Sequence, residues 1–212
     1  MKKENLVSMI NAYDQSAAQY QNTIAKLKNY DHTYEYLIEL LSDSMMILDL
    51  ACGPANISKY LLKKKNLRIT GYDLSDEMLS LARQQIPNGV FENKGIDDFD
   101  VDMKVDLVVN GFGLPYLDDE HMLRSLKKSF VALKTNGLIY LSFMDGSKSG
   151  FETPSFNQNV EFFLYYHSWD VISDMIKKIG FTVIKKWEID YNESDGRVTR
   201  DIVVIAQKLC CD

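Results

Sequence analysis

The order of hydrophobic patterns along the chain is the feature that most constrains its fold. Short apolar runs rich in β-branched residues, which predict buried strands, alternate with stretches whose apolar residues recur every three or four positions, which predict helices. The predicted strands are 46–50, 67–72, 105–110 and 138–143, with helical patterns around 57–61, 78–82 and 122–130. This βαβ repetition predicts a parallel, doubly wound sheet covered by helices on both faces.

The pattern changes toward the end of the sequence. After a predicted helix at 171–179, two extended runs at 181–191 and 199–207 flank Asp195-Gly196, a pair typical of hairpin turns. We therefore expect a three-layer α/β, Rossmann-like fold. Its sheet should have seven strands, with the last strands forming an antiparallel hairpin.

Charge and composition argue against several function classes. A net charge of −6 lacks the basic footprint that neutralises a phosphate backbone, so we expect no nucleic-acid partner. No apolar run approaches the ~20 residues of a membrane helix, and residues 1–15 are too polar for a signal peptide, so we expect a cytoplasmic protein without a membrane partner. Cys52, Cys210 and Cys211 form no metal-ligand spacing, so no zinc site or disulfide framework is predicted.

The segment 47–56 carries the most specific chemical signal. A predicted strand ends in small residues, Ala51, Gly53 and Ala55, and a helix begins near Asn56. Small residues let a ligand approach the backbone, and the N–H groups of the following helix can face a carboxylate or phosphate. The alternative is a purely structural strand-to-helix turn.

An acidic residue, Asp73, ends the second predicted strand. A carboxylate at this place can accept hydrogen bonds from both hydroxyls of an adenosine ribose. The alternative is that Asp73 only caps the helix beginning near Asp76, although Ser75 is the better cap.

Together these residues resemble the class I S-adenosylmethionine-dependent methyltransferases of the small-molecule type. The family's first motif, which reads like LDxGxGxG, appears as Leu48-Asp49-Leu50-Ala51-Cys52-Gly53-Pro54-Ala55. Four further motifs follow in the family's order at 73–79, 93–98, 105–110 and 133–138. Alanine stands at 51 and 55 where the family usually has glycine. Because alanine disfavours positive φ, its methyl group can crowd the cofactor at these positions.

The resemblance implies S-adenosylmethionine as the cofactor, S-adenosylhomocysteine as its product and no metal. Ala51 and Gly53 are expected to line the methionine part of the cofactor. Asp49 is expected to hold the ammonium group of that part directly or through water. The backbone carbonyl of Asn110 should lie near the same end.

The nucleoside part of the cofactor is assigned in the same way. Asp73, followed by Leu74, is expected to bind the ribose. Ile96 and Asp97 are expected to flank the adenine, with the Asp97 carboxylate receiving the exocyclic amine. Asp98 is a neighbouring competitor for that role, and we prefer Asp97.

Aromatic residues outside the motifs are candidates for the lid and the acceptor side. Tyr13 and Tyr20 lie in a segment that resembles the Tyr-Asp-x-x-Ala-x-x-Tyr of small-molecule methyltransferases, which folds over the cofactor. Their faces can attract a methylsulfonium or a cationic substrate, and the alternative is packing of one helix face. Phe112 and Tyr116 are expected to border the transferred methyl group.

A general base is needed only if the methyl acceptor arrives protonated. His167 is the side chain best suited to that task near neutral pH. It lies in 162–169, which resembles a substrate-side strand and loop, where Tyr166 is expected to face the substrate. The alternative is a structural histidine before a helix capped by Ser168.

We interpret 1–212 as one methyltransferase domain. Its parts are a helical N-terminal lid at 1–43, a cofactor-binding core at 44–145, a substrate-side segment at 146–170 and a C-terminal helix and hairpin at 171–212. The expected function is methyl transfer to an O, N or C atom of an unidentified small molecule, and aromatic residues in 146–166 favour a flat or hydrophobic acceptor. The alternatives are a non-catalytic S-adenosylmethionine-binding sensor or partner subunit and, less favoured because G-x-G-x-x-G is missing, an NAD-dependent oxidoreductase. The oligomeric state is left open.

Overall fold

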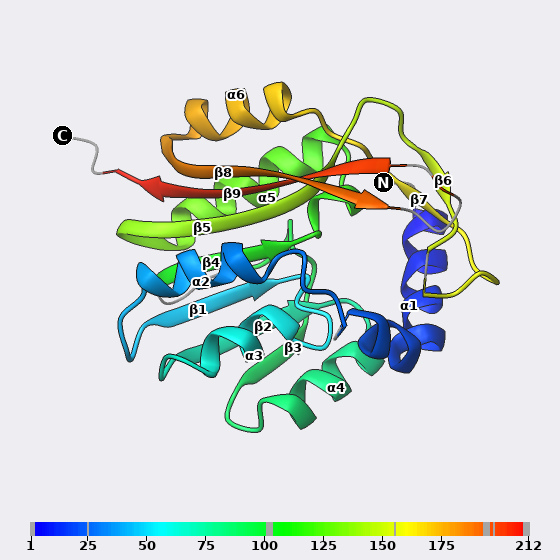
Figure 1. Ribbon diagram of the computed structural model, residues 1–212, viewed down its shortest axis with the longest axis horizontal. Helices are drawn as coiled ribbons and strands as arrows, with labels where there is room; N and C mark the ends of the chain where they lie inside the picture. Colours follow the sequence, from blue (N-terminus) through cyan, green and yellow to red (C-terminus); the bar gives the residue numbers. More distant parts are fainter. Residues whose placement is uncertain are drawn as a thin grey trace.

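The computed structural model describes residues 3–24, 26–100, 104–154, 156–192, 196 and 198–209, and it confirms the predicted α/β class (Figure 1). A seven-stranded sheet has the strand order β3-β2-β1-β4-β5-β9-β8. The parallel strands are β1 (Met46–Leu50), β2 (Arg68–Asp73), β3 (Val90–Asn93), β4 (Val105–Gly111) and β5 (Leu133–Asp145). The parallel part of the sheet therefore places the ends of β1, β2 and β4 along one edge.

The predicted antiparallel end of the sheet is also confirmed. β9 (Val198–Lys208) pairs antiparallel with both β5 and β8 (Phe181–Asn192), so the last strand in sequence lies inside the sheet. Gly196 in the connection has a φ of 85°, the left-handed conformation that glycine adopts readily. Asp195, the other half of the predicted turn, lies outside the described residues.

Two strands, β5 and β3, differ from the sequence prediction. β5 begins at Leu133, five residues before the predicted start at 138, and its pairing with β4 shifts register between Val105 and Leu107. β3 has no counterpart among the predicted strands. It is four residues long and buries only Phe91, so its periodicity is too short to detect.

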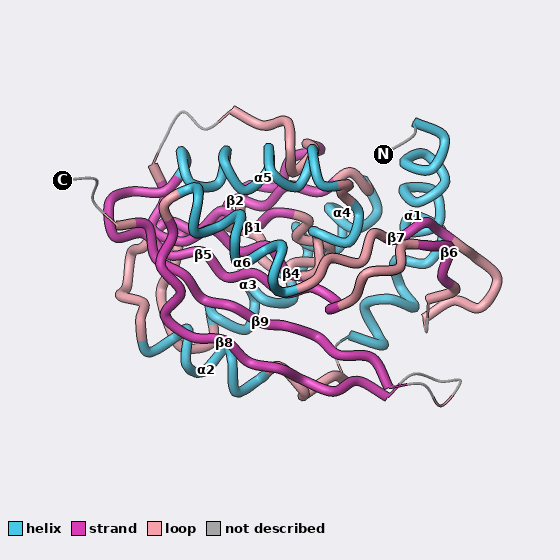
Figure 2. The backbone as a smooth tube through the Cα atoms, turned by 90° about the horizontal axis from the view of Figure 1, so that it is seen from above, coloured by secondary structure: helices cyan, strands magenta, loops and turns pink. Residues whose placement is uncertain are grey.

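Two layers of helices cover the sheet, because alternate strand residues point to opposite faces. Ile47 packs on the face covered by α2 (Asp31–Glu39), α3 (Asn56–Leu62) and α4 (Asp76–Gln85). Leu48 packs on the face covered by α5 (Asp119–Ala132) and α6 (Trp169–Ile179). Figure 2 shows the strands between α5 on one side and α2 on the other. None of the helices within the described ranges is both long and apolar enough to cross a bilayer.

The N-terminal segment divides into two parts with different positions. α1 (Lys3–Ile24) packs against α4 and lies beside a small two-stranded sheet of β6 (Gly150–Glu152) and β7 (Phe162–Leu164) (Figures 1 and 2). α2 instead belongs to a core layer, because Leu37, Ile38 and Leu41 are buried in the same cluster as Ile47. Within the predicted N-terminal lid at 1–43, α2 therefore packs into the core, whereas α1 lies beside β6 and β7.

Candidate functional site

The loop after β1 folds back on itself through three left-handed residues. Ala51, Gly53 and Ala55 have φ values of 52°, 51° and 61°. The left-handed conformation costs an L-residue roughly 1–2 kcal/mol of conformational energy, because its Cβ approaches a carbonyl oxygen. Glycine has no Cβ and avoids this cost. This geometry explains why the resembling motif has glycine at alternate positions. α3 then begins at Asn56, directly after Ala55.

Asp73 ties this loop to the end of β2. Its Oδ2 accepts a hydrogen bond from the Gly53 N–H at 2.8 Å, and its Oδ1 accepts one from the Ser75 N–H at 2.9 Å. Desolvation raises the pKa of Asp73, while the N–H donors of Ser75 and Gly53 act in the opposite direction. α4 is capped by Ser75, whose Oγ accepts from the Met78 N–H at 3.1 Å. The alternative that Asp73 is only the helix cap is therefore wrong.

Asp49 is the most deeply buried carboxyl of the loop region, with 2% of its surface exposed. Burial raises its pKa to about 7; the hydrogen bond from Ser58 lowers the pKa in part, and the nearby charge of Asp73 raises it. The Ser58 hydroxyl lies 2.5 Å from Asp49 Oδ2. Such a group is neutral or charged near physiological pH according to what binds beside it.

A cavity of about 240 Å³ opens beside the loop. Most of the residues predicted to contact the cofactor line it: Tyr13, Tyr20, Ala51, Gly53, Asp73, Leu74, Ile96 and Asp97. Asp98 is not among its lining residues, and its exposed carboxylate lies 3.7 Å from Lys128 Nζ. The geometry therefore favours Asp97 over Asp98 for contact with a bound ligand, and the binding roles themselves stay predictions.

The smaller cavity is also lined by His121, for which the sequence analysis predicts no role. Its Nδ1 lies 2.5 Å from Asp118 Oδ1, and its Nε2 lies 4.0 Å from Asp97 Oδ2. Asp118 also caps α5, accepting from the His121 N–H. In the sequence, His121 is marked only by its position in the first turn of α5. Such a position is too common to identify a ligand contact.

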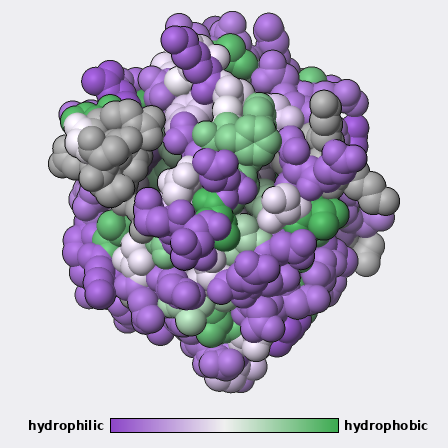
Figure 3. Space-filling model, turned by 90° about the vertical axis from the view of Figure 1, so that its right-hand side faces the viewer, coloured by the Kyte–Doolittle hydropathy of each residue, from purple (hydrophilic) through white to green (hydrophobic). Residues whose placement is uncertain are grey.

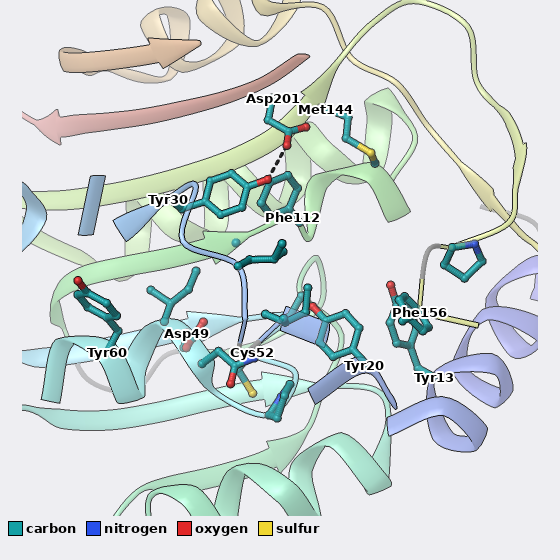
Figure 4. A pocket seen from close by; sticks show the side chains of 18 of the residues that line it. Tyr13, Tyr20, Tyr30, Asp49, Cys52, Tyr60, Phe112, Met144, Phe156 and Asp201 are labelled. Carbon is teal, nitrogen blue, oxygen red and sulfur yellow. Dashed lines mark hydrogen bonds between the residues drawn. The ribbon is translucent and has the colours of Figure 1, made fainter. Parts of the chain in front are cut away.

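A second cavity of about 380 Å³ adjoins the first (Figure 4). The two share Tyr13, Tyr20, Ala51, Gly111, Phe112 and Tyr116 as lining residues. Asp49 lines only the larger cavity. Asn110 lines neither, and its side chain is buried with Oδ1 accepting from the Gly113 N–H at 3.0 Å. The loop after β1 therefore borders both spaces.

Tyr13 lies at the centre of the aromatic wall between the cavities. Its hydroxyl hydrogen-bonds to the Tyr116 hydroxyl, and its ring centroid lies 5.6 Å from that of Tyr20. Phe156 and Phe162 pack against the same ring at 5.5 and 5.4 Å. The two tyrosines of α1 thus pack against neighbouring rings and also line the cavities, and their contact with a cofactor stays a prediction.

The three residues predicted for the acceptor side, Phe112, Tyr116 and Tyr166, all line the larger cavity. Tyr166 lines the larger cavity and donates a hydrogen bond to Glu152 Oε1 at 3.4 Å.

Figure 3 views the molecule from the side where α1 lies in Figure 1. This surface is mostly hydrophilic, with small hydrophobic areas scattered over it.

His167 lies away from both cavities. It is 5% exposed, its Nε2 lies 2.8 Å from the Leu117 carbonyl oxygen, and its Nδ1 lies 3.4 Å from Asp119 Oδ1. Neither cavity has His167 among its lining residues. The structure therefore gives this histidine a packing role beside α5. Both ring nitrogens face protein oxygens, so the described geometry favours the structural alternative, and a catalytic role for His167 stays an untested prediction.

Comparison with known proteins agrees with this architecture. The family described as Methyltransferase domain matches residues 47–137. Trans-aconitate 2-methyltransferase of Enterobacter sp. (strain 638) is 36% identical over 106 residues, which are 50% of this chain and 41% of that protein. Demethylmenaquinone methyltransferase of Chlorobaculum parvum is 32% identical over 96 residues, 45% of this chain and 39% of that protein. The matches thus span about two fifths of the length of these relatives.

A solved structure matches nearly the whole fold. The 1,6-didemethyltoxoflavin-N1-methyltransferase of Burkholderia thailandensis aligns with a TM-score of 0.74 and 14% identity, covering 99% of this chain and 91% of that one. At this identity the likeness concerns the fold, and the sequence match at 47–137 adds the family's motif region. Residues 47–137 thus match a methyltransferase family, and nearly the whole chain has the fold of solved methyltransferase structures.

Proposed function

We propose that the protein transfers a methyl group from S-adenosylmethionine to an O, N or C atom of a small molecule. The observation that carries the proposal is that two adjoining cavities lie at the edge of the sheet where the parallel strands end. The smaller contains Asp73 and Asp97, and the larger contains Asp49 and an aromatic wall. In this proposal the nucleoside part of the cofactor occupies the smaller cavity, and the larger cavity takes the methionine part beside Asp49 and the acceptor against the aromatic wall.

The residues present suit this cofactor. Asp73 would hold the ribose hydroxyls, because each oxygen of a carboxylate can accept further hydrogen bonds beside those from Gly53 and Ser75. Asp49 would face the ammonium group, whose charge favours the ionised carboxylate. Ile96 would pack on the adenine. The left-handed loop residues would let the methionine part approach the backbone.

The sulfonium supplies an activated methyl group, so the protein's own task is chiefly positioning and exclusion of water. Tyr13, Tyr116 and Phe112 line both cavities and would border the point where the two ligands meet. The aromatic wall supports a flat or hydrophobic acceptor. The curated relatives, whose names give trans-aconitate and demethylmenaquinone as substrates, support a small molecule as the acceptor class.

Calorimetric titration tests the cofactor assignment. We expect S-adenosylmethionine and S-adenosylhomocysteine to bind with micromolar affinity, and NAD to bind at least 100-fold more weakly, on the order of 3 kcal/mol. Tighter binding of NAD, or no binding of either S-adenosyl compound, would overturn the proposal. Transfer of the methyl group from isotopically labelled S-adenosylmethionine into a metabolite extract then separates an enzyme from a domain that only binds the cofactor.

A further inference from the structure

Two polar side chains, Asp97 and His121, face each other in the wall of the smaller cavity. Asp97 lies in the loop after β3, whereas His121 lies in the first turn of α5. His121 Nε2 lies 4.0 Å from Asp97 Oδ2, which is too far for a direct hydrogen bond. Both line the cavity, and 33% of the His121 side chain and 18% of the Asp97 side chain are exposed. A ligand in this cavity can therefore contact both side chains.

Asp118 fixes the orientation of the His121 ring and the position of its proton. His121 Nδ1 lies 2.5 Å from Asp118 Oδ1, and the same oxygen accepts from the His121 backbone N–H at 3.0 Å. An ionised carboxylate only accepts hydrogen bonds, so the ring proton lies on Nδ1. A neutral imidazole carries one N–H, and Nε2 is therefore left as an acceptor on the side of Asp97.

Arg124 is the cation that approaches this pair. Its Nη1 lies 3.7 Å from Asp97 Oδ2, and its Nη2 lies 3.1 Å from Glu120 Oε1. A carboxylate has about four lone-pair sites, so the contact of Asp97 with Arg124 leaves sites for a ligand donor. The neighbouring carboxylates of Glu120 and Asp98 are not among the lining residues.

The other polar side chains of this lining are associated with the larger cavity or the loop after β1. Three of them also line the larger cavity: Tyr13, Tyr20 and Tyr116. The fourth, Asp73, is held to the loop through the Gly53 N–H. Of the two cavities, Asp97 and His121 line only the smaller. This pair therefore belongs to the part of the smaller cavity that is not shared.

The separation of the two acceptors fits a primary amino group on a planar ring. A nitrogen about 2.9 Å from each acceptor sees two atoms that are 4.0 Å apart at an angle of roughly 90°. The two N–H bonds of a planar amino group diverge by about 120°, so each hydrogen bond bends by only about 15°. A carbonyl oxygen in the same place would direct its lone pairs at two acceptors.

Apolar side chains supply contacts for the faces of such a ring. Leu74 and Ile96 follow β2 and β3, Met78 lies in α4 and Leu117 precedes α5. All four line the same cavity as Asp97 and His121. A flat heterocycle with one amino group thus matches both the apolar and the polar part of this lining.

We propose that His121 determines the cofactor's base: with Asp97 it accepts the two N–H bonds of the adenine amino group, so the protein selects 6-aminopurine over 6-oxopurine. The proposal rests on the proposed function, because it interprets the smaller cavity as the nucleoside space. It adds a residue of α5 to a site whose other carboxylates follow the ends of parallel strands.

S-adenosylhomocysteine and S-inosylhomocysteine test the selection, because the second carries a carbonyl oxygen in place of the amino group. Both are titrated calorimetrically at about pH 8, where an ordinary imidazole is neutral. We expect S-adenosylhomocysteine to bind roughly 100-fold more tightly, the effect of two lost hydrogen bonds, one of them to a charged group. Asp49 would contact the homocysteine part, which is identical in both ligands, so the ratio of affinities isolates the base.

His121→Phe keeps a flat ring and removes the acceptor. S-adenosylhomocysteine affinity should fall roughly fivefold, the effect of one neutral hydrogen bond, while S-inosylhomocysteine affinity should not fall. The α5 cap remains, because Asp118 also accepts from the backbone N–H of residue 121. His32→Phe is the matched control and should change neither affinity, because His32 packs near Trp187 and lines neither cavity.

A third ligand, N6-methyl-S-adenosylhomocysteine, counts the N–H bonds that are used. It retains one N–H, so the wild type should bind it roughly fivefold more weakly than S-adenosylhomocysteine. In His121→Ala the missing ring leaves space for the methyl group, and the two affinities should agree within twofold. This variant also decides the question if His121→Phe fails to fold.

The outcomes separate this inference from the proposed function. Equal wild-type affinity for S-adenosylhomocysteine and either analogue would overturn the inference. So would a loss in His121→Phe or His121→Ala by the same factor for all three ligands, which indicates a structural role. Binding of none of the ligands by the wild type would overturn the proposed function together with the inference, whereas binding without discrimination removes the inference alone.

Discussion

The two cavities are assembled from the chain in different ways. The smaller one draws Ala51, Asp73 and Ile96 from segments that follow three successive strands of the parallel sheet. The larger one draws Tyr30 from the segment before α2 and Asp201 from the last strand. The carboxyl ends of parallel strands meet at one edge, so residues within 51–97 supply much of the first site, whereas the second also needs the last strand of the sheet.

Among the variants that distinguish the two cavities, Asp73→Ala is expected to have the largest effect on ligand affinity. The variant removes the carboxylate assigned to the ribose and leaves the Gly53 and Ser75 N–H groups without their acceptor. S-adenosylhomocysteine affinity should fall roughly 100-fold, as for two hydrogen bonds to a charged group. Calorimetry measures this, with Asp98→Ala as the control. An affinity within twofold of the wild type would contradict the assignment of Asp73 to the ribose.

His167→Ala tests whether the histidine belongs to either cavity. Removing a buried ring that contacts Leu117 and Asp119 should lower the free energy of unfolding by about 2 kcal/mol. Urea denaturation measures that loss. S-adenosylhomocysteine affinity should stay within twofold of the wild type, and a loss of methyl transfer beyond the loss of folded protein would restore a catalytic role.

A pH titration probes Asp49, which lies only in the larger cavity. Its pKa of about 7 means that the carboxyl is mainly protonated below that pH, whereas a bound ammonium group requires the ionised form. S-adenosylhomocysteine should therefore bind roughly tenfold more weakly at about pH 6 than at about pH 8. Calorimetry at both values checks this. Asp49→Asn should remove the step, which separates it from titration of Asp73.

The Asp49 carboxyl also affects the free energy of unfolding, with a pH dependence opposite to its effect on ligand binding. The native state without ligand holds the Asp49 proton more tightly than the unfolded chain, because the folded pKa is raised from 3.8 to about 7. The contribution of Asp49 to the free energy of unfolding should thus decrease as pH rises through this window. Denaturation of wild type and Asp49→Asn across the window measures it.

The smallest effect concerns strain in the loop beside both cavities. Ala51→Gly should raise the free energy of unfolding by about 0.5–1 kcal/mol, because glycine adopts the observed φ of 52° without the Cβ conflict. Ala55→Gly should gain less, since the Ala55 methyl group is fully buried. Ala82→Gly in α4 is the control and should be destabilising. Urea denaturation of all three variants measures these changes. A lower free energy of unfolding for Ala51→Gly than for the wild type would contradict the strain assignment.

The contrast between the cavities also explains what the sequence could predict. The strand ending at Leu50, the acid at Asp73 and the C-terminal antiparallel pair follow from local periodicity and motif spacing. Asp201 has no local signal, because its meaning arises only when β9 enters the sheet beside β5. His121 and Tyr30 are similar cases. For His167, residue type alone could not reveal that Leu117 and Asp119 face the ring.

The internal position of β9 has a consequence during protein synthesis. The sheet cannot close between β5 and β8 until the residues of β9 have left the ribosome, although every residue of the loop after β1 has emerged long before. Until then the paired face of β5 is an unprotected strand edge that can join another chain. Nascent chains that stop short of residue 198 should therefore retain the early βαβ units but lack Asp201 and be prone to aggregate.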